Sequence, residues 1–251
     1  MQGAVVTGAS SGIGAALARE LGSRGWHCVL LARREERLRA LAEELGGEYE
    51  VCDVADRAAV EGAAARVRER HPQVKLLVNN AGVSARADFL EGDPERIEQT
   101  MRTNYLGGVW CLRAFLPALE AAHPSDVVNI VSVAGTFAVP QSGPYSASKH
   151  AQLAFSRATS ASLRGRGIRV HTVNPGLVET EGFRQRERLR RRVFRRMVIE
   201  PEQVARHVAG LIGKGPTETS IPRWYRLPGL VQALAPNLVS RFVARRSGVH
   251  R

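Results

Sequence analysis

The sequence has few cysteines and no long apolar run. Only Cys28, Cys52 and Cys111 occur among its 251 residues, and no two of them stand at a CxxC or other paired spacing. A disulfide framework and a zinc site are therefore not expected, a reducing interior is favoured, and we expect no metal. No window of about 18 residues is apolar and free of charge, so no membrane-spanning helix is predicted.

No targeting signal and no linker between domains is recognised in the sequence. The sequence begins MQGAVVTGAS, which is typical of a strand and a Gly-rich turn, not of a basic and then apolar leader. It contains no internal repeat and no linker rich in Pro and Ser. We therefore expect one domain over residues 1–251, in the cytoplasm, and contact with a membrane surface stays an open alternative.

Positive charge is unevenly distributed along the chain. Lys and Arg number 36 against 24 Asp and Glu, which gives a net charge of +12 and a pI near 10.8. Residues 184–197 carry eight Arg and one Glu, residues 223–251 carry six Arg and no acid, and the remainder carries 22 basic and 23 acidic side chains. Because the body is neutral and no signature of a DNA- or RNA-binding fold accompanies the Arg, nucleic acid is not expected as a partner.

Short apolar runs alternate with helical patterns through much of the chain. The runs that indicate buried strands are Ala4–Val6, Cys28–Ala32, Tyr49–Cys52, Leu76–Asn79, Val127–Val131 and Val170–Val173. The helical patterns cover Gly14–Gly22, Glu35–Leu45, Ala58–Arg70, Glu95–Glu120 and Tyr145–Arg164. This alternation predicts an α/β fold in three layers, with a doubly wound parallel sheet between helices. Beyond it, we expect an excursion of helices over 177–215 and a Pro-broken tail over 221–251.

A Gly-rich turn follows the first strand. Its glycines let the backbone turn tightly and approach a pyrophosphate, and the next helix offers free N–H groups and the positive end of its dipole. A purely structural turn is the alternative, but the position between a predicted strand and a predicted helix favours dinucleotide binding. The candidate residues of this turn are Gly8, Ser10, Ser11, Gly12, Ile13 and Gly14.

The end of the second strand indicates which dinucleotide binds. An acid there would bond the ribose hydroxyls and favour NAD, but the sequence has Arg33 and Arg34 after Ala32. Two guanidinium groups match the geometry of a 2′-phosphate. Alternatively, both Arg simply open a solvated helix, although helix starts prefer acids. We predict NADP(H), with Arg33 as the main contact.

Four polar residues form a candidate catalytic set. Tyr145 and Lys149 share one helix face, and an ammonium near a phenol favours the phenolate and lowers its pKa toward the range of acid–base catalysis. Ser132 follows the strand Val127–Val131, where parallel sheets carry functional groups, and Asn104 lies in the preceding long helix. Taken singly, Ser132 is explained as a helix cap and Asn104 as a helix-interior amide; together with the YxxxK pair they predict catalysis.

Seven motifs stand in a specific order. They are TGASSGIG (7–14), Cys52-Asp53-Val54, Asn79–Gly82, Asn104, Ser132, YSASK (145–149) and Asn174-Pro175-Gly176 with Thr180. With them the chain resembles the short-chain dehydrogenase/reductase family over residues 3–180, and Arg33 resembles its NADP-preferring branch. The resemblance implies a Rossmann-type domain with a seven-stranded parallel sheet. It also implies a homodimer or homotetramer formed through the helices of Asn104 and Tyr145.

The resemblance also implies residue roles. Asp53 and Val54 would hold the adenine, Asn80, Ala81 and Gly82 the ribose next to it, Tyr145 and Lys149 the nicotinamide ribose, and Pro175, Gly176, Val178 and Thr180 the carboxamide and pyrophosphate. It implies a reversible reduction of a ketone or aldehyde by NADPH. Ser132 would bond the developing alkoxide, Tyr145 would protonate it, and Asn104 would relay the proton through water. A cofactor-binding scaffold or redox sensor with little turnover is the alternative.

Substrate choice is expected to depend on the two basic segments. In the lid, residues 181–200, Phe183 is a candidate substrate contact together with Ser132 and Tyr145, and Leu189, Val193 and Met197 form one stripe of a helix. This helix is either a solvated surface or faces an anionic substrate or lipid headgroups.

In the tail, residues 221–251, Asn237 is expected to cap a helix that gathers its apolar residues opposite Arg241 and Arg245: Leu238, Val239, Phe242 and Val243. This pattern, with Trp224 and Tyr225 nearby, is typical of an interfacial anchor and equally of a tail packed over the substrate pocket or a subunit interface. A loose similarity to the C-terminal extensions of members that act on steroids, retinoids or other lipids favours an apolar substrate.

Overall fold

The fold is built on one sheet of seven parallel strands. The structure is a computed structural model that describes residues 2–84, 88–138, 142–184, 197–215 and 217–247, with side chains up to Arg241. The strand order is β3-β2-β1-β4-β5-β6-β7, with all neighbours parallel. The strands are β1 (Gln2–Thr7), β2 (Trp26–Ala32), β3 (Glu48–Val51), β4 (Leu76–Asn79), β5 (Ser125–Ile130), β6 (Ile168–Pro175) and β7 (Glu218–Ile221).

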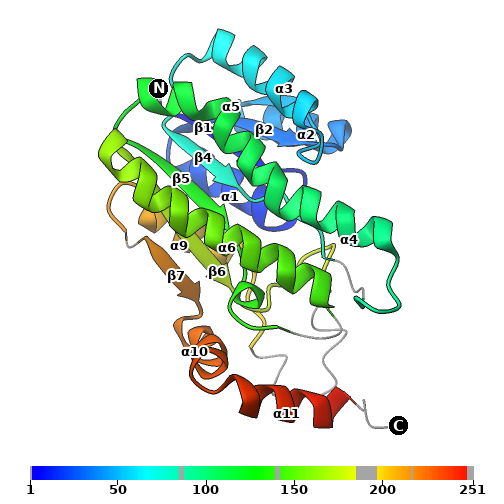
Figure 1. Cartoon of the computed structure of the whole chain (residues 1–251). Coiled ribbons are helices and arrows are strands. Elements are labelled where there is room, and N and C mark those ends of the chain that lie inside the picture. Colours follow the sequence, from blue (N-terminus) through cyan, green and yellow to red (C-terminus); the bar gives the residue numbers. More distant parts are fainter. Residues whose placement is uncertain (1, 85–87, 139–141, 185–196, 216, 248–251) are drawn as a thin grey trace.

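Helices cover both faces of this sheet. In Figure 1, α3, α5 and α6 cross the face toward the viewer, and α1, α2 and α9 lie behind it. The helices are α1 (Gly12–Ser23), α2 (Glu35–Leu45), α3 (Arg57–Arg70), α4 (Pro94–Met101), α5 (Gly107–Ala121), α6 (Gly143–Leu163), α9 (Pro201–Leu211), α10 (Arg226–Leu234) and α11 (Pro236–Ser247). The three-layer, doubly wound α/β fold expected from the sequence is confirmed.

Strand residues alternate between two hydrophobic cores. Ala4 and Val6 pack against α1, α2 and α9, whereas Val5, between them, packs against α3 and α5. Successive side chains of a strand point to opposite faces, so a strand covered on both sides is apolar throughout. All six residues of β5 are buried. The short apolar runs in the sequence are therefore explained by burial on both faces.

All six expected strands are present, and their ends differ from the expected ends by at most two residues. One correction concerns the seventh strand, which lies at Glu218–Ile221 in a stretch that the apolar pattern did not mark. It is an edge strand whose residues are half-buried or exposed. Such a strand has no need of the buried apolar run by which the others were recognised.

The long helix expected over Glu95–Glu120 is interrupted. Helix α4 ends at Met101, a π-helical turn follows over Arg102–Leu106, and α5 begins at Gly107. A Cβ on Gly107 would come within 2.8 Å of Val54, so the helix passes close to the loop after β3. Wide turns of this kind inside helices often occur at functional sites, and this one contains Asn104.

The excursion of helices expected over 177–215 reduces, in the described part, to α9. Before α9, Val178 pairs with Ile199 in an isolated parallel bridge, which brings the two ends of the lid together. The lid helix predicted around Leu189 and Val193 lies outside the described residues.

The tail forms two helices beyond the end of β7. Helix α11 begins at Pro236, so Asn237 lies inside it and is not the predicted cap. The predicted stripe is described only for Leu238 and Val239, because the side chains of Phe242, Val243 and Arg245 lie outside the described part. Figure 1 places both helices at the end of the molecule opposite the N-terminus. Among the described residues, no helix combines the length and the apolar character that a membrane crossing requires.

Candidate active site

The Gly-rich turn joins β1 to α1 at the carboxyl edge of the sheet. Gly8 and Gly12 have φ angles of 66° and 55°, in the left-handed region that favours glycine. A Cβ on Gly14 would lie 2.3 Å from the carbonyl oxygen of Gly8. Ser11 makes no side-chain bond as the N-cap of α1, and no acid lies in the first turn. The start of α1 thus has the open N–H groups and the close backbone approach that a pyrophosphate requires.

The residues that follow β4 are hydrogen-bonded to the start of this turn. The hydroxyl of Thr7 accepts hydrogen bonds from the backbone N–H groups of Asn80 and Ala81, at 3.0 and 3.1 Å. The Asn80 amide donates to the carbonyl oxygen of Thr7 at 2.9 Å. Strands β1 and β4 flank the point where the strand order reverses, which is where doubly wound folds bind ligands.

The two arginines after β2 have different partners. The Arg34 guanidinium donates to the hydroxyls of Ser10 and Ser11, at 2.9 and 2.6 Å, and so lies over the Gly-rich turn. Arg33 is more exposed and faces a carboxylate oxygen of Asp53 at 3.5 Å. The structure therefore brings Arg34, rather than Arg33, to the two serines, and it places Arg33 beside the residue expected to bind adenine.

An ion pair next to Arg34 was not predicted from the sequence. Glu181, at the start of the lid, pairs with Arg37 of α2 and lies 3.9 Å from Arg34. The hydrogen bond with Arg37 is the main cause that holds the pKa of Glu181 below its ordinary value. Residues 144 positions apart meet here, so no local pattern indicated the contact.

The loop after β6 reaches the Gly-rich turn from the other side. A Cβ on Gly12 would lie 3.1 Å from the side chain of Thr180. Gly176 lies under the ring of Tyr225, which would be 2.5 Å from a Cβ there, and Val178 is buried. Of the remaining predicted members, Asp53 and Val54 follow β3 and Pro175 is the last residue of β6, at the same edge.

Ser132 and Tyr145 are brought together between β5 and α6. The Ser132 hydroxyl bonds the Tyr145 phenol and also accepts from the backbone N–H of Ala134 at 3.1 Å, as the cap of a short turn. Ser132 is thus a cap, as the alternative explanation expects, and its contact with the phenol leaves the catalytic role a prediction. Burial raises the pKa of Tyr145, and the bond from Ser132 offsets this only in part.

Lys149 lies buried beside them. Its Nζ donates to the carbonyl oxygen of Ile130 at 3.1 Å and to Oε1 of Gln152 at 2.7 Å, and lies 5.9 Å from the centre of the Tyr145 ring. Burial lowers the pKa of Lys149 to about 7. The expected lowering of the Tyr145 pKa by this cation is thus wrong for the chain's own side chains, because desolvation outweighs a cation that bonds elsewhere.

Asn104 is fully buried, and its amide makes three hydrogen bonds. Its Oδ1 accepts from the N–H of Val83 at 2.7 Å, and its Nδ2 donates to the carbonyl oxygen of Val83 at 3.0 Å and to the hydroxyl of Ser148 at 2.9 Å. A Cβ on Gly82 would lie 3.2 Å from Asn104 and 3.7 Å from the Lys149 amine. The structure thus brings the segment after β4 and the catalytic set together.

Other buried polar groups at this site were not predicted. Gln152 stands one helical turn after Lys149, and that i, i+3 spacing on a buried helix face was the only available signal. A second chain of bonds joins Asn79 to Asn129 at 2.9 Å, Asn129 to Ser156 at 2.8 Å, and Ser156 to Thr172 at 2.6 Å. It ties α6 to β4, β5 and β6, and so orients the helix that carries Tyr145 and Lys149.

Phe183 lies in a tight turn with Thr180, which bonds its backbone in both directions. Its side chain is half-buried. Its role as a substrate contact stays a prediction.

The sequence and the fold are similar to those of known proteins. The profile of the short chain dehydrogenase family matches residues 2–190. Dehydrogenase/reductase SDR family member 7B of Bos taurus is 31% identical over 98% of this chain and 82% of its own. Sulfoacetaldehyde reductase 2 of Chromohalobacter salexigens is 40% identical over 70% of this chain and 73% of its own. Among solved structures, actinorhodin polyketide ketoreductase with NADPH is 33% identical, with a TM-score of 0.81 over 89% of this chain and 97% of that one.

The Gln152 contact generates a test of how the Lys149 charge is set. Gln152→Leu removes an acceptor of the ammonium and lowers the pKa of Lys149 from about 7 by roughly one unit, whereas Gln152→Glu raises it. The chain has only three lysines, so NMR of protein labelled with carbon-13 lysine follows Lys149 directly. Gln99→Leu, which removes a bond to Thr103 elsewhere, is the control. An unchanged Lys149 titration in both Gln152 variants would show that the contact has no electrostatic role.

Proposed function

The chain belongs to the short-chain dehydrogenase family, and we propose that it is an NADPH-dependent reductase of a ketone or aldehyde, reversible with the alcohol. The observation that supports this most directly is the convergence of Ser132, Tyr145 and Lys149 next to the segment after β4, which packs on the Gly-rich turn. The reductases among its relatives and structural neighbours are in keeping with a carbonyl substrate.

The chain's own groups fit the NADP(H) that this proposal requires. The open start of α1 suits the pyrophosphate, and Arg34 with Ser10 and Ser11 suits a phosphate on the adenosine ribose. Gly82, without a side chain, leaves room between Asn104 and Lys149 on the side expected for the nicotinamide ribose. When bound, NADPH supplies the hydride, and the protein orients the reacting groups and handles the proton.

In the reducing direction Tyr145 acts as the proton donor. Its phenol is protonated at neutral pH, as an acid requires, and burial raises its pKa further. Ser132, bonded to the same phenol, stabilises the alkoxide oxygen as charge develops on it. Lys149, when protonated, is a cation 5.9 Å from the centre of the Tyr145 ring and would offset part of the burial cost of the phenolate left after transfer. Asn104 holds Val83 and Ser148 in place, and its water relay stays a prediction.

The substrate is proposed to be apolar. The tail packs against the active-site loops, because Tyr225 covers Gly176 and a Cβ on Gly229 would lie 2.5 Å from the Thr136 hydroxyl, just after Ser132.

The homodimer or homotetramer is proposed to form through α5 and α6. On α6, Phe155 is half-buried and Ala158 is exposed. The alternative function is a nucleotide-binding scaffold or redox sensor with little turnover.

Tyr145→Phe tests the catalytic assignment. The wild type is expected to consume NADPH with members of a panel of ketones and aldehydes, and the variant to bind NADPH equally well but to lose about a thousandfold in turnover. Tyr49→Phe, at the far edge of the sheet, is the matched control. Full activity of Tyr145→Phe would remove the proton-donor role. A wild type that binds NADPH tightly but reduces nothing in the panel would favour the scaffold or sensor.

The arginines after β2 test the proposed NADPH preference. Arg33→Ala and Arg34→Ala are each expected to raise the KM for NADPH by about tenfold or more and to change the KM for NADH little, because only NADPH offers a 2′-phosphate to a guanidinium. Steady-state kinetics with both dinucleotides measures this. Arg39→Ala on the following helix α2, where Arg39 pairs with Glu35, is the control. Equal effects on both dinucleotides would refute a 2′-phosphate contact.

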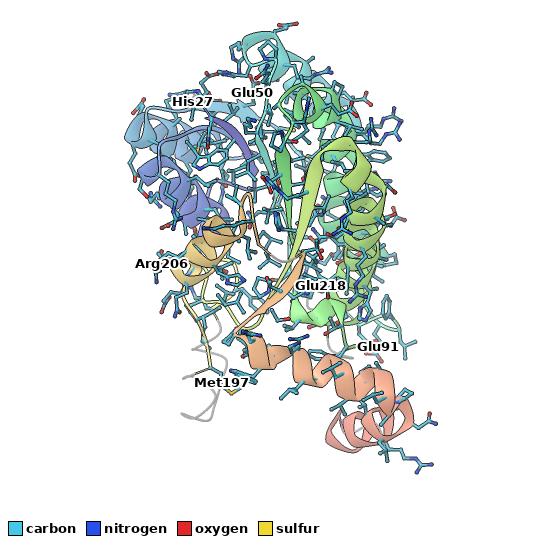
Figure 2. All side chains as sticks on the ribbon, turned by 90° about the vertical axis from the view of Figure 1, so that its left-hand side faces the viewer. His27, Glu50, Glu91, Met197, Arg206 and Glu218 are labelled. Carbon is cyan, nitrogen blue, oxygen red and sulfur yellow. The ribbon has the colours of Figure 1, made fainter. Side chains whose placement is uncertain are left out.

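We further propose that the tail contacts an anionic membrane surface. Leu227, Leu230, Val231 and Leu234 form one exposed stripe on α10, with Leu234 85% exposed. Exposed Arg223, Arg226 and Arg241 lie nearby in a segment without acids. Apolar side chains beside arginines match the interior and the headgroups of an anionic membrane. Figure 2 shows both tail helices projecting from the molecule.

Flotation with anionic vesicles at moderate salt tests this contact. Leu230→Glu combined with Leu234→Glu should lower the partition to vesicles by tenfold or more, because two apolar side chains are lost. The control is Gln232→Glu combined with Ala233→Glu, which adds the same charge outside the stripe. This double variant should float with the vesicles to a greater extent than the Leu230 and Leu234 double variant. These variants spare the buried Tyr225 and Gly229, which a truncation would remove. Wild type that stays at the bottom, or a stripe that proves by sedimentation to pair two copies, would refute membrane contact.

A further inference from the structure

Two histidines and a glutamate meet at the amino edge of the sheet. His27 lies in β2, Glu48 opens β3, and His71 follows the last residue of α3. Figure 2 shows His27 at the end of the molecule opposite the tail helices. The dinucleotide and catalytic residues follow the carboxyl ends of the strands, so this group has no place in the reaction proposed above.

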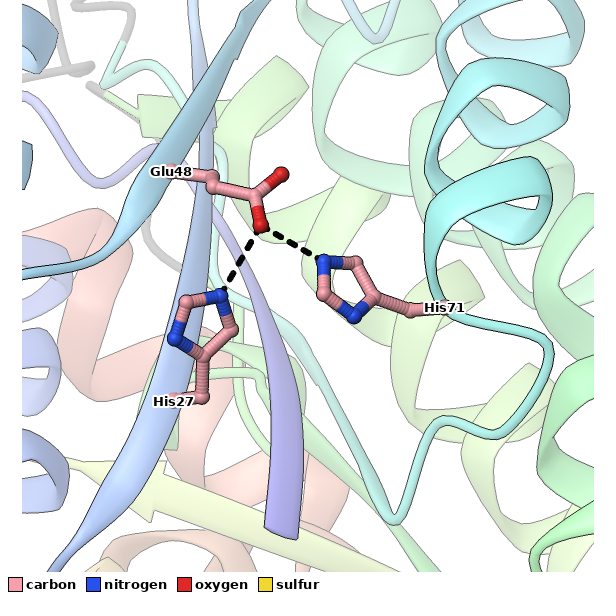
Figure 3. A group of neighbouring side chains, drawn as sticks. All are labelled: His27, Glu48 and His71. Atoms are coloured by element: carbon pink, nitrogen blue, oxygen red, sulfur yellow. Dashed lines mark hydrogen bonds and ion pairs between the residues drawn. The ribbon is translucent and has the colours of Figure 1, made fainter. Parts of the chain in front are cut away.

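The three side chains converge on one point. The Nε2 atom of His27 lies 3.0 Å, and that of His71 2.7 Å, from the same oxygen, Oε1 of Glu48. One ligand atom from each residue lies within 4.8 Å of the other two. Figure 3 shows the two rings pointing at this carboxylate from different elements. All three side chains are partly exposed, between 18% and 32%, so the point is open to solvent.

The second carboxylate oxygen of Glu48 is already held. The Arg70 guanidinium donates to Oε2 at 2.8 Å and to Glu50 at 2.8 Å, and Arg66 pairs with the other oxygen of Glu50. These bonds fix the orientation of the Glu48 carboxylate and leave Oε1 directed at the imidazoles. A ligand that is bonded from behind in this way is typical of a metal site.

We propose that His27, Glu48 and His71 bind a zinc ion, with water as the fourth ligand. Two imidazole nitrogens and one carboxylate oxygen are a donor set that zinc takes, at about 2.0 to 2.2 Å from each atom. Around a tetrahedral ion, ligand atoms lie about 3.4 Å apart, so the present contacts need to open by less than about 1 Å. Each imidazole then binds through Nε2 and carries its proton on Nδ1, which requires no net loss of a proton from a neutral ring.

The bound ion would add a direct link between three elements that hydrogen bonds and the Arg66 and Arg70 ion pairs already join at this corner. It connects the starts of β2 and β3 to the end of α3. The proposed role is structural, and it is independent of the proposed function. The absence of paired cysteines, on which the expectation of no metal rested, does not bear on a site built from His and Glu.

Zinc titration of the full-length, metal-free protein tests the site. Calorimetry is expected to give one zinc ion per chain, and zinc at a hundredfold excess over its Kd should raise the Tm by about 5 °C or more. His27→Ala and His71→Ala should each weaken binding by at least about a hundredfold, because a direct ligand is lost. His123→Ala, in a loop at a distance, is the matched control and should bind as the wild type does.

A cobalt titration provides a readout that does not depend on stability. Cobalt(II) in the wild type should show the visible absorption of a tetrahedral ion, and Glu48→Gln, which retains a polar side chain in place of the carboxylate, should weaken it strongly. If an alanine variant fails to fold, His71→Gln takes its place. Wild type that binds no zinc at millimolar concentration, or zinc bound equally by the His27 and His71 variants, would overturn the proposal.

Discussion

The parallel sheet is the constraint on which the rest of this protein depends. Because all seven strands run in the same direction, their carboxyl ends share one edge, and the loops that leave them meet there. The Gly-rich turn, the segment after β4, Ser132 and the loop after β6 are far apart in the sequence but adjacent at this edge. The helices on both faces bury the central strands, so polar chemistry is concentrated at the strand ends.

Burial also sets the electrostatics of the candidate active site. It raises the pKa of the Tyr145 phenol above its ordinary value and lowers the pKa of Lys149 to about 7. Isolated, a buried ammonium would be strongly disfavoured; here Ile130 and Gln152 accept its hydrogen bonds. The chain of bonds from Asn79 to Thr172 holds α6 against the sheet, which fixes the distance between the phenol, Ser132 and the ammonium.

The two ends of the molecule differ in character. The carboxyl edge carries the proposed nucleotide and catalytic residues, and the tail packs on it through Tyr225 and Gly229 while it exposes the stripe of α10. The amino edge carries the His27, Glu48 and His71 group, braced by Arg70. The net charge of +12 therefore comes from residues 184–197 and 223–251, and the remainder of the chain is close to neutral.

The sequence by itself determined the fold class, six of the seven strands and the order of the functional motifs, because buried strands and Gly-rich turns leave local patterns. It did not reveal the polar edge strand β7 or the π-helical turn at Asn104, which lack such a pattern. Only the tertiary structure decided that Arg34 rather than Arg33 bonds the serines, that Gln152 holds Lys149, and that His71 meets His27 and Glu48. These contacts join side chains through strand register, helix packing and rotamer, and none of these is written in the spacing of residues along the chain.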